Sequence, residues 1–176
     1  MFDGFKLYSP NRELLGYLKD VLSASVEHEI NKLSQMEIEL VPDETAITPG
    51  MFLEWDGQDY LIQTVTDIKD AKGNYARITA EIASTELLGD ILPSLELNVR
   101  TAAEALTEIL GGNRFGWTVG TVEVEGTASM GKQEYKSRLE LLLEVPKLWG
   151  GVLAWDTKSK KVDLLNSLGT DNGVRL

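Results

Sequence analysis

The stretch that decides the fold runs from Ser137 to Leu168 and reads SRLELLLEVPKLWGGVLAWDTKSKKVDLLNSL. It predicts one helix followed by one β-hairpin. Ser137 and Glu140 match a capping box, in which the serine side chain accepts from the amide three residues on and the glutamate reaches back to the serine amide. Leucines then recur from position 139 at three- and four-residue spacing, which gives one apolar stripe.

The end of this helix and the hairpin after it are also marked. The pair Gly150–Gly151 is expected to end the helix, since glycine adopts the left-handed conformation at little cost. Pro146 lies inside the helical pattern and cannot donate to the preceding turn, so we expect a kink or an early stop there. Residues 152–155 and 162–165 then read as two strands joined by a polar turn.

The first half of the chain is dominated by strand patterns. Apolar residues alternate with glutamate and glutamine between Leu33 and Val41, which is the period-2 signature of a half-buried strand. Asp56–Gly57 predicts a hairpin turn between two further strands, and Tyr75–Ala83 alternates again. We expect residues 1–92 to form a β-rich domain with a barrel-like meander.

The second half mixes helices and strands. Ser84–Leu92 is expected to contain a short helical turn, and a capping box that begins at Thr101 opens a helix ending at Leu110. Residues 115–124 read as a strand and the polar residues 125–136 as a flexible loop. We therefore expect an α+β protein, mainly antiparallel β with two to three short helices, whose second domain covers residues 93–176 (helix, strand, helix, hairpin) and is cut short at its C-terminus.

Composition excludes several classes of function. The 176 residues carry a formal net charge of −11 and no cysteine. Binding to a nucleic-acid backbone requires clustered lysine and arginine, so we expect no nucleic acid binding. The same charge disfavours an anionic membrane surface, and no apolar run approaches the roughly 20 residues that span a bilayer. Without cysteine there is no disulfide framework and no thiolate metal site.

The N-terminus, MFDGFKLYSPNRELLG, lacks a basic segment followed by an apolar one. We therefore expect no signal peptide, and synthesis and folding in a cytoplasm.

Residues that could carry chemistry form no catalytic constellation. His28 is the single histidine, and on a strand its neighbours Glu27 and Glu29 would face away from it, so a surface histidine is the favoured interpretation. The acidic residues are numerous enough to be close by chance, and no pair stands out by spacing as a glycosidase would require. We expect no catalytic, cofactor-binding or metal-binding residues and no cofactor.

Aromatic and glycine motifs have structural interpretations as well. The four tryptophans could line a sugar groove, but each lies in an apolar pattern or at the end of an element, where core packing is the commoner role. Gly111–Gly112 is expected to stop a helix. Asp171–Gly173 is expected to form a turn rather than a calcium loop, because the preceding positions are Leu168, Gly169 and Thr170 and supply no carboxylate.

Taken in order, several short segments resemble the N-terminal region of bacteriophage and prophage tail-tip hub proteins, the tail-associated lysin or "prophage endopeptidase tail" group. Each segment is unspecific, and the resemblance lies in their order and spacing over most of the chain. They are Asn31 before Glu37-Ile38-Glu39-Leu40, Ile47-Thr48-Pro49-Gly50-Met51, Tyr60-Leu61-Ile62 with Val65, Thr79-Ala80-Glu81 leading to Leu87-Leu88, the helix Ala102–Leu110 before Phe115-Gly116-Trp117, and Trp149-Gly150-Gly151 with Trp155-Asp156, reaching Leu164 and Gly169. Pro146 departs from the group's pattern.

The resemblance implies a structural component of the phage tail tip, a baseplate hub that closes the tail tube and joins the distal tail ring. It implies a homotrimer whose partners are the distal tail protein and the tail tube or tape-measure protein, located at the virion tail tip. Members that cut cell wall carry that activity in C-terminal regions, so we expect no enzyme activity here. Two alternatives stay open: a cell-wall hydrolase or peptidase using carboxylates, and a carbohydrate-binding module using tryptophans.

Two further expectations concern this hub. Carboxylates such as Glu37 and Glu39 are expected to face solvent or a lumen, where negative charge would repel DNA. The trimer contact is expected to use sheet edges within the first 90 residues.

Overall fold

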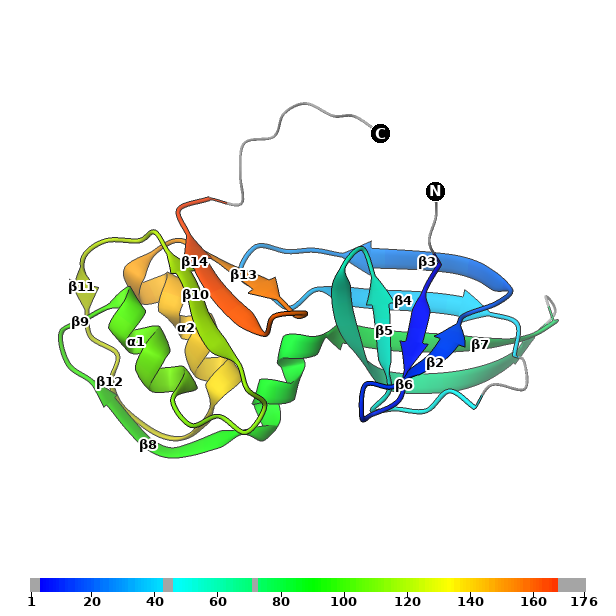
Figure 1. Ribbon diagram of the computed structural model, residues 1–176, viewed down its shortest axis with the longest axis horizontal. Helices are drawn as coiled ribbons and strands as arrows, with labels where there is room; N and C mark the ends of the chain where they lie inside the picture. Colours follow the sequence, from blue (N-terminus) through cyan, green and yellow to red (C-terminus); the bar gives the residue numbers. More distant parts are fainter. Residues whose placement is uncertain (1–3, 43–45, 71–72, 168–176) are drawn as a thin grey trace. The chain divides into compact units, whose positions relative to one another are not determined.

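A computed structural model describes residues 4–42, 46–70 and 73–167 of the chain (Figure 1). The chain divides into two compact units, Met1–Thr85 and Glu86–Leu176. The boundary between the units therefore lies between Thr85 and Glu86, before the boundary at residue 92 that the sequence predicts; residue 92 lies inside a strand of the second unit. The fold is α+β, with strands predominating over helices.

The first unit is one seven-stranded sheet, in the order β2-β1-β5-β6-β7-β4-β3 with antiparallel neighbours throughout. Its strands are β1 (Lys6–Tyr8), β2 (Leu14–Tyr17), β3 (Val21–Glu27), β4 (Gln35–Leu40), β5 (Phe52–Trp55), β6 (Gln58–Asp70) and β7 (Gly73–Ile82). The sheet-forming runs 33–41 and 75–83 are confirmed as β4 and β7.

One face of this sheet forms the core of the first unit. Along β4 the buried residues are Met36, Ile38 and Leu40, and the register pairs Ile38 with Ile78 of β7. Because successive side chains of a strand point to opposite faces, the residues between them form a second, polar face. The hairpin β5–β6 turns at Asp56 and Gly57, which both have positive φ, as a two-residue turn of this type requires.

The sheet does not close into a barrel. Among the described residues, β2 pairs only with β1 and β3 only with β4, so the ladder has two free edges. The expected simple meander is also wrong in one respect: β4 lies between β3 and β7 instead of beside β5. Residues 18–20 link the two edge strands. The Leu18 amide donates to the carbonyl of Phe5, just before β1, and the Asp20 carbonyl accepts from the amide of Val41, just after β4. The sheet therefore curls toward itself without joining.

The second unit combines helices with short sheets, and a 3-10 helix, η1 (Ala83–Gly89), runs into it. Its strands are β8 (Ile91–Leu97), β9 (Arg100–Thr101), β10 (Thr118–Val122), β11 (Thr127–Ala128), β12 (Gly131–Ser137), β13 (Val152–Asp156) and β14 (Lys161–Leu165), and its α-helices are α1 (Ala102–Leu110) and α2 (Arg138–Trp149). The predicted hairpin is β13–β14, and β10 adds to it in parallel.

Both predicted capping boxes are present. The Ser137 hydroxyl accepts from the Glu140 amide at 3.2 Å, and the Glu140 carboxylate accepts from the Ser137 amide at 2.8 Å. The hydrogen bonds that the Glu140 carboxylate accepts from the Ser137 amide and hydroxyl lower the pKa of Glu140, and the equivalent bonds from Thr101 lower the pKa of Glu104. The early stop at Pro146 is not observed, since α2 continues to Trp149. Burial of Val145, Pro146 and Trp149 along this helix offsets the hydrogen bond that proline removes.

The loop expected over 125–136 is wrong: most of that segment forms β11 and β12. β12 pairs with β8 along a two-stranded ribbon, from Gly131 opposite Leu97 to Ser137 opposite Ile91. Apart from the buried ends Leu97 and Ser137, the ribbon is half-buried or exposed. β12 is polar except for Tyr135, so its sequence lacks the apolar alternation that identifies a strand.

A buried carboxylate organises the second unit around Trp117. Glu86 Oε1 accepts a hydrogen bond from Trp117 Nε1 at 2.7 Å and from Lys160 Nζ at 2.8 Å. Lys160 also donates to the Phe115 carbonyl at 2.8 Å. Trp117 is buried and meets Trp155 edge to face, with ring centroids 5.8 Å apart. Glu86 therefore fixes the β13–β14 turn against the core tryptophan.

Candidate functional site

The most developed polar surface of the first unit lies on the outer face of β3, β4 and β7. The register aligns its side chains in three rows across these strands. The rows are Glu27–Gln35–Glu81, Ser25–Glu37–Thr79 and Ser23–Glu39–Arg77. We call these nine residues the polar face.

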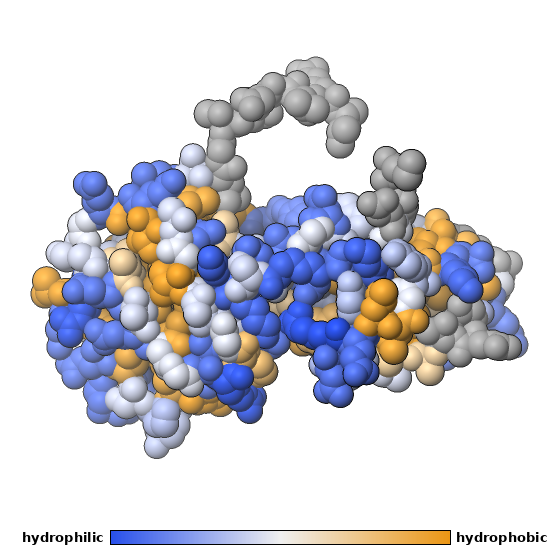
Figure 2. All heavy atoms as spheres, viewed as in Figure 1, coloured by the Kyte–Doolittle hydropathy of each residue, from blue (hydrophilic) through white to orange (hydrophobic). Residues whose placement is uncertain are grey.

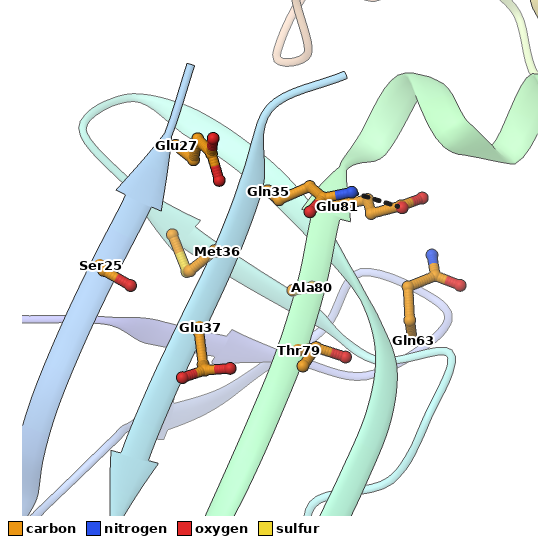
Figure 3. A pocket seen from close by; sticks show the side chains of 9 residues that line it. All are labelled: Ser25, Glu27, Gln35, Met36, Glu37, Gln63, Thr79, Ala80 and Glu81. Carbon is orange, nitrogen blue, oxygen red and sulfur yellow. Dashed lines mark hydrogen bonds between the residues drawn. The ribbon is translucent and has the colours of Figure 1, made fainter. Parts of the chain in front are cut away.

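A pocket of about 430 Å³ opens on this face, with Glu27, Glu37 and Glu81 among its lining residues (Figure 3). Gln63 of β6 lies on its far side. Ser25 lines the pocket on the β3 side, and its short side chain leaves that side open.

The carboxylates of the polar face have unequal partners. Arg77 Nη2 donates to Glu39 Oε1 at 2.7 Å, and Arg77 Nε lies 3.7 Å from Glu37 Oε1. Hydrogen bonding to Glu39 and the charge of Glu37 raise the pKa of Arg77 above its usual value. Glu81 accepts from Thr85 Oγ1 at 2.9 Å and, more weakly, from Gln35 Nε2 at 3.5 Å.

Arg77 is the only cation among the nine residues, which also include four glutamates. The polar face therefore carries a net negative charge, because one guanidinium cannot balance four carboxylates. The Glu37 side chain is 51% exposed and that of Glu39 26% exposed, so both reach solvent, as expected from the sequence. What this arrangement can do chemically is attract cationic groups and repel anionic ones.

The two free edges of the sheet differ in chemistry. β2 exposes three large apolar residues, Leu14, Leu15 and Tyr17, each by half or more of its surface. β3 exposes mostly small residues between Leu22 and Glu27. On the face shown in Figure 2, hydrophilic side chains divide the apolar ones into small groups.

The single histidine is a surface residue. His28 lies just beyond β3, is exposed, and its Nδ1 is 2.7 Å from Ser34 Oγ. Within the described ranges, no three His, Asp or Glu side chains gather closely enough to hold a metal ion. No helix in the described part of the chain has the length and apolar character to cross a bilayer.

The tryptophans pack rather than line a groove. Trp117 and Trp149 are buried, and Trp149 donates to the Arg100 carbonyl at 2.8 Å. Trp55 stacks on Phe5 with centroids 6.4 Å apart. Gly111 and Gly112 follow α1, as expected of a helix stop. The turn expected at Asp171–Gly173 lies outside the described residues.

Part of the polar face is predictable from the sequence. Glu37 and Glu39 were recognised from the alternation in β4. Arg77, Thr79 and Glu81 alternate in the same way with the apolar residues of β7, so the signal was present. What the sequence alone does not supply is the β4–β7 pairing that brings them beside Glu37 and Glu39.

Comparison with known families places two adjacent models along the chain. Residues 6–82 match a model described as the prophage endopeptidase tail N-terminal domain, and residues 90–164 match the prophage endopeptidase tail domain. The two matches follow the two compact units. None of the curated proteins compared with this chain matches it by sequence.

Solved structures share the fold at low sequence identity. A prophage tail protein from Listeria monocytogenes is 12% identical with a TM-score of 0.75, over 99% of this chain and 55% of that one. A prophage tail protein from Shewanella oneidensis is 14% identical with a TM-score of 0.61, over 99% and 56%. An Escherichia coli protein, described as a type VI secretion component similar to T4 bacteriophage tail proteins, is 12% identical with a TM-score of 0.58, over 93% and 49%. The chain thus spans about half the length of these structures.

Proposed function

Because this chain belongs to the prophage endopeptidase tail family, we propose that it is a structural module of a phage tail tip, a baseplate hub that closes the tail tube and joins the distal tail ring. The observation that carries the proposal is the pair of family matches, which together follow nearly the whole described chain in the order of its two units. The shared fold with prophage tail proteins supports it.

We propose a homotrimer, with the distal tail protein and the tail tube or tape-measure protein as its other partners, located at the virion tail tip after synthesis in the bacterial cytoplasm. The β2 edge is the proposed self-contact. Its apolar residues Leu14, Leu15 and Tyr17 are exposed in the single chain, and clustered apolar surface of this kind marks interaction sites. A three-fold axis near β2 would bury three copies of the same patch.

In such a ring, the polar face supplies negative charge to the lumen or to solvent. Glu37 and Glu39 would repel DNA electrostatically, which suits a conduit and agrees with the expectation that this chain does not bind nucleic acid. A solved trimer with a net basic lumen would refute this part of the proposal.

The family description contains the word endopeptidase, which keeps a cell-wall hydrolase as the second candidate function. We propose that this chain contributes structure and not hydrolysis. A peptidoglycan zymogram separates the two candidates, because only the hydrolase predicts a cleared band.

The trimer is tested by light scattering over a range of protein concentrations. We expect the mass of three chains for the wild type and the mass of one chain for Leu14→Glu combined with Tyr17→Glu, since charge would be forced into the apolar contact. Leu88→Glu is the matched control, because Leu88 is also exposed but lies outside the sheet. A wild-type protein that stays monomeric at every concentration, or a trimer unaffected by the β2 substitutions, would contradict this assignment of the contact.

A further inference from the structure

The free edge of β3 has unpaired backbone groups at known positions. The Ile82 amide donates to the Ser34 carbonyl at 2.9 Å, at the end of the β4–β7 ladder. Hydrogen-bonded pairs alternate along an antiparallel ladder. The backbone N–H and C=O groups of the even-numbered residues of β4 therefore point toward β7, and those of the odd-numbered residues point toward β3. The Val41 amide, which donates to the Asp20 carbonyl at 3.1 Å, agrees with this parity.

The same alternation then fixes the direction of each backbone group in β3. Ser25 lies opposite Glu37, so its amide and carbonyl face β4. Ala24 and Val26 direct their amides and carbonyls away from the sheet. In the described part of the chain no strand pairs with this side of β3.

Beyond the register shift between Val21 and Ser23, the edge lacks the side-chain features that usually prevent strand addition. Between Leu22 and Val26 there is no lysine, no proline and no charged residue, and the residues are serine, alanine and two aliphatic side chains. Edges of this kind are templates for pairing with another extended segment. Leu22 is 59% exposed, so apolar surface on one side of the edge is uncovered as well.

The side chains beside this edge indicate what kind of segment fits. A strand added to β3 would lie about 4.8 Å from it. On the polar face, its side chains would stand next to Ser25 and Glu27, and a long one could pass over Ser25 into the pocket that holds Glu37. On the opposite face, its side chains would meet Ala24 and Val26, which lie opposite Ile38 and Met36.

We propose that β3 accepts, by strand addition, an extended segment of a partner protein in which lysine or arginine alternates with apolar residues. Charge selects the basic side chains, because four glutamates and one arginine line the polar face. Backbone hydrogen bonds to Ala24 and Val26 supply the binding, and the pocket supplies the selectivity. A second copy of this chain is disfavoured as the occupant of this edge, since its own edge strands β2 and β3 contain no lysine or arginine.

The test uses the full chain and a fluorescein-labelled peptide as long as β3, alternating lysine and valine, followed by fluorescence anisotropy. We expect saturable binding that weakens as salt is raised, and no binding of the same peptide with glutamate in place of lysine. Equal binding of the two peptides, or binding of neither, would overturn the proposal.

Two variants of Ala24 separate strand addition from general charge attraction. Ala24→Pro removes only an outward-facing amide, and proline is tolerated on edge strands in that orientation, so the fold is kept and peptide affinity falls at least tenfold. Ala24→Thr retains the amide and is expected to bind within twofold of the wild type. Glu37→Gln should weaken binding about threefold and reduce its salt dependence. An Ala24→Pro protein that is folded by circular dichroism and binds normally would refute strand addition.

A ligand-side experiment keeps the wild-type protein and does not depend on the folding of any variant. The peptide is N-methylated either at every lysine or at every valine. Because alternate amides of a strand face its neighbour, one methylated peptide should lose binding and the other should keep it. Equal affinities for the two would overturn the proposal. If Ala24→Pro dissociates the trimer, β3 pairs with a second copy of the chain, and the proposed partner segment is overturned. If the trimer is unchanged, the β2 contact does not depend on β3.

Discussion

Glu86 provides the sharpest test of how the second unit is stabilised. Its side chain is only 9% exposed and accepts from both Trp117 and Lys160. In Glu86→Leu, the buried indole N–H loses its acceptor, which costs about 1–3 kcal/mol. Breaking a buried ion pair by removing one partner costs about 3–5 kcal/mol in all. Lys160 is 24% exposed and can partly turn to water, so we expect a loss near the lower bound, about 3 kcal/mol.

Glu86→Gln distinguishes the hydrogen bond from the charge. The amide oxygen still accepts from Trp117, so the expected loss is about 1–1.5 kcal/mol. Glu125→Leu is the matched control, because Glu125 is an exposed glutamate of the same unit, and its expected effect is within about 0.5 kcal/mol. Combining Glu86→Leu with Lys160→Met should lose less than the sum of the single changes.

The assay is urea unfolding followed by tryptophan emission, since three of the four tryptophans belong to the second unit. The free energy of unfolding is compared between variants at constant slope. A loss below about 1 kcal/mol for Glu86→Leu would refute the reasoning. Equal losses for the leucine and glutamine variants would also refute it, because only the glutamine variant keeps an acceptor for Trp117.

Three other predictions concern pH and backbone geometry. Burial, with a smaller contribution from Asp56, raises the pKa of Tyr60 from 10.0 to about 12. The free energy of unfolding should therefore fall by on the order of 2–3 kcal/mol as the pH rises from 10 to 12. Tyr60→Phe should remove that part of the alkaline loss, as measured by urea unfolding. The capping hydrogen bonds lower the pKa of Glu140, so their stabilisation is present above about pH 4.5 and is lost as pH falls below it; Glu140→Gln should flatten the acid limb of a thermal-melting profile. Gly151 has a φ of +85°, and a Cβ atom there would lie 2.6 Å from Val124 Cγ2. Gly151→Ala should therefore lower the free energy of unfolding by about 1–3 kcal/mol. An unchanged free energy of unfolding would show that the backbone before β13 can move to make room.

Local signals made much of the fold predictable. The two capping boxes and the alternation in β4 and β7 are each readable within a few residues, and the structure confirms them. The β8–β12 ribbon was not predictable in this way. Pro93 argues against a strand at β8, and the polar residues of β12 give no period-2 pattern. The pairing is a property of two segments about 40 residues apart.

The candidate site shows the same division between local and long-range information. The orientation of Glu37 and Glu39 follows from one strand, and this was predicted. Their proximity to Arg77 and the shape of the pocket depend on β4 inserting between β3 and β7, which no local pattern encodes. The directions of the backbone groups on β3 likewise require the register and not only the sequence.

The insertion of β4 has a consequence for how the first unit folds. Its hairpins β1–β2, β3–β4, β5–β6 and β6–β7 join neighbours in sequence and can form early. Two ladders that bring distant segments together, β1–β5 and β4–β7, must then connect them; Lys6 and Glu54 are 48 positions apart, and Gln35 and Glu81 are 46. Closing such long loops costs entropy before the contacts form, so these two ladders should limit the folding rate. Replacing Ile38 or Ile78, which lie opposite each other, by another apolar residue should therefore slow refolding more than a change in any hairpin turn.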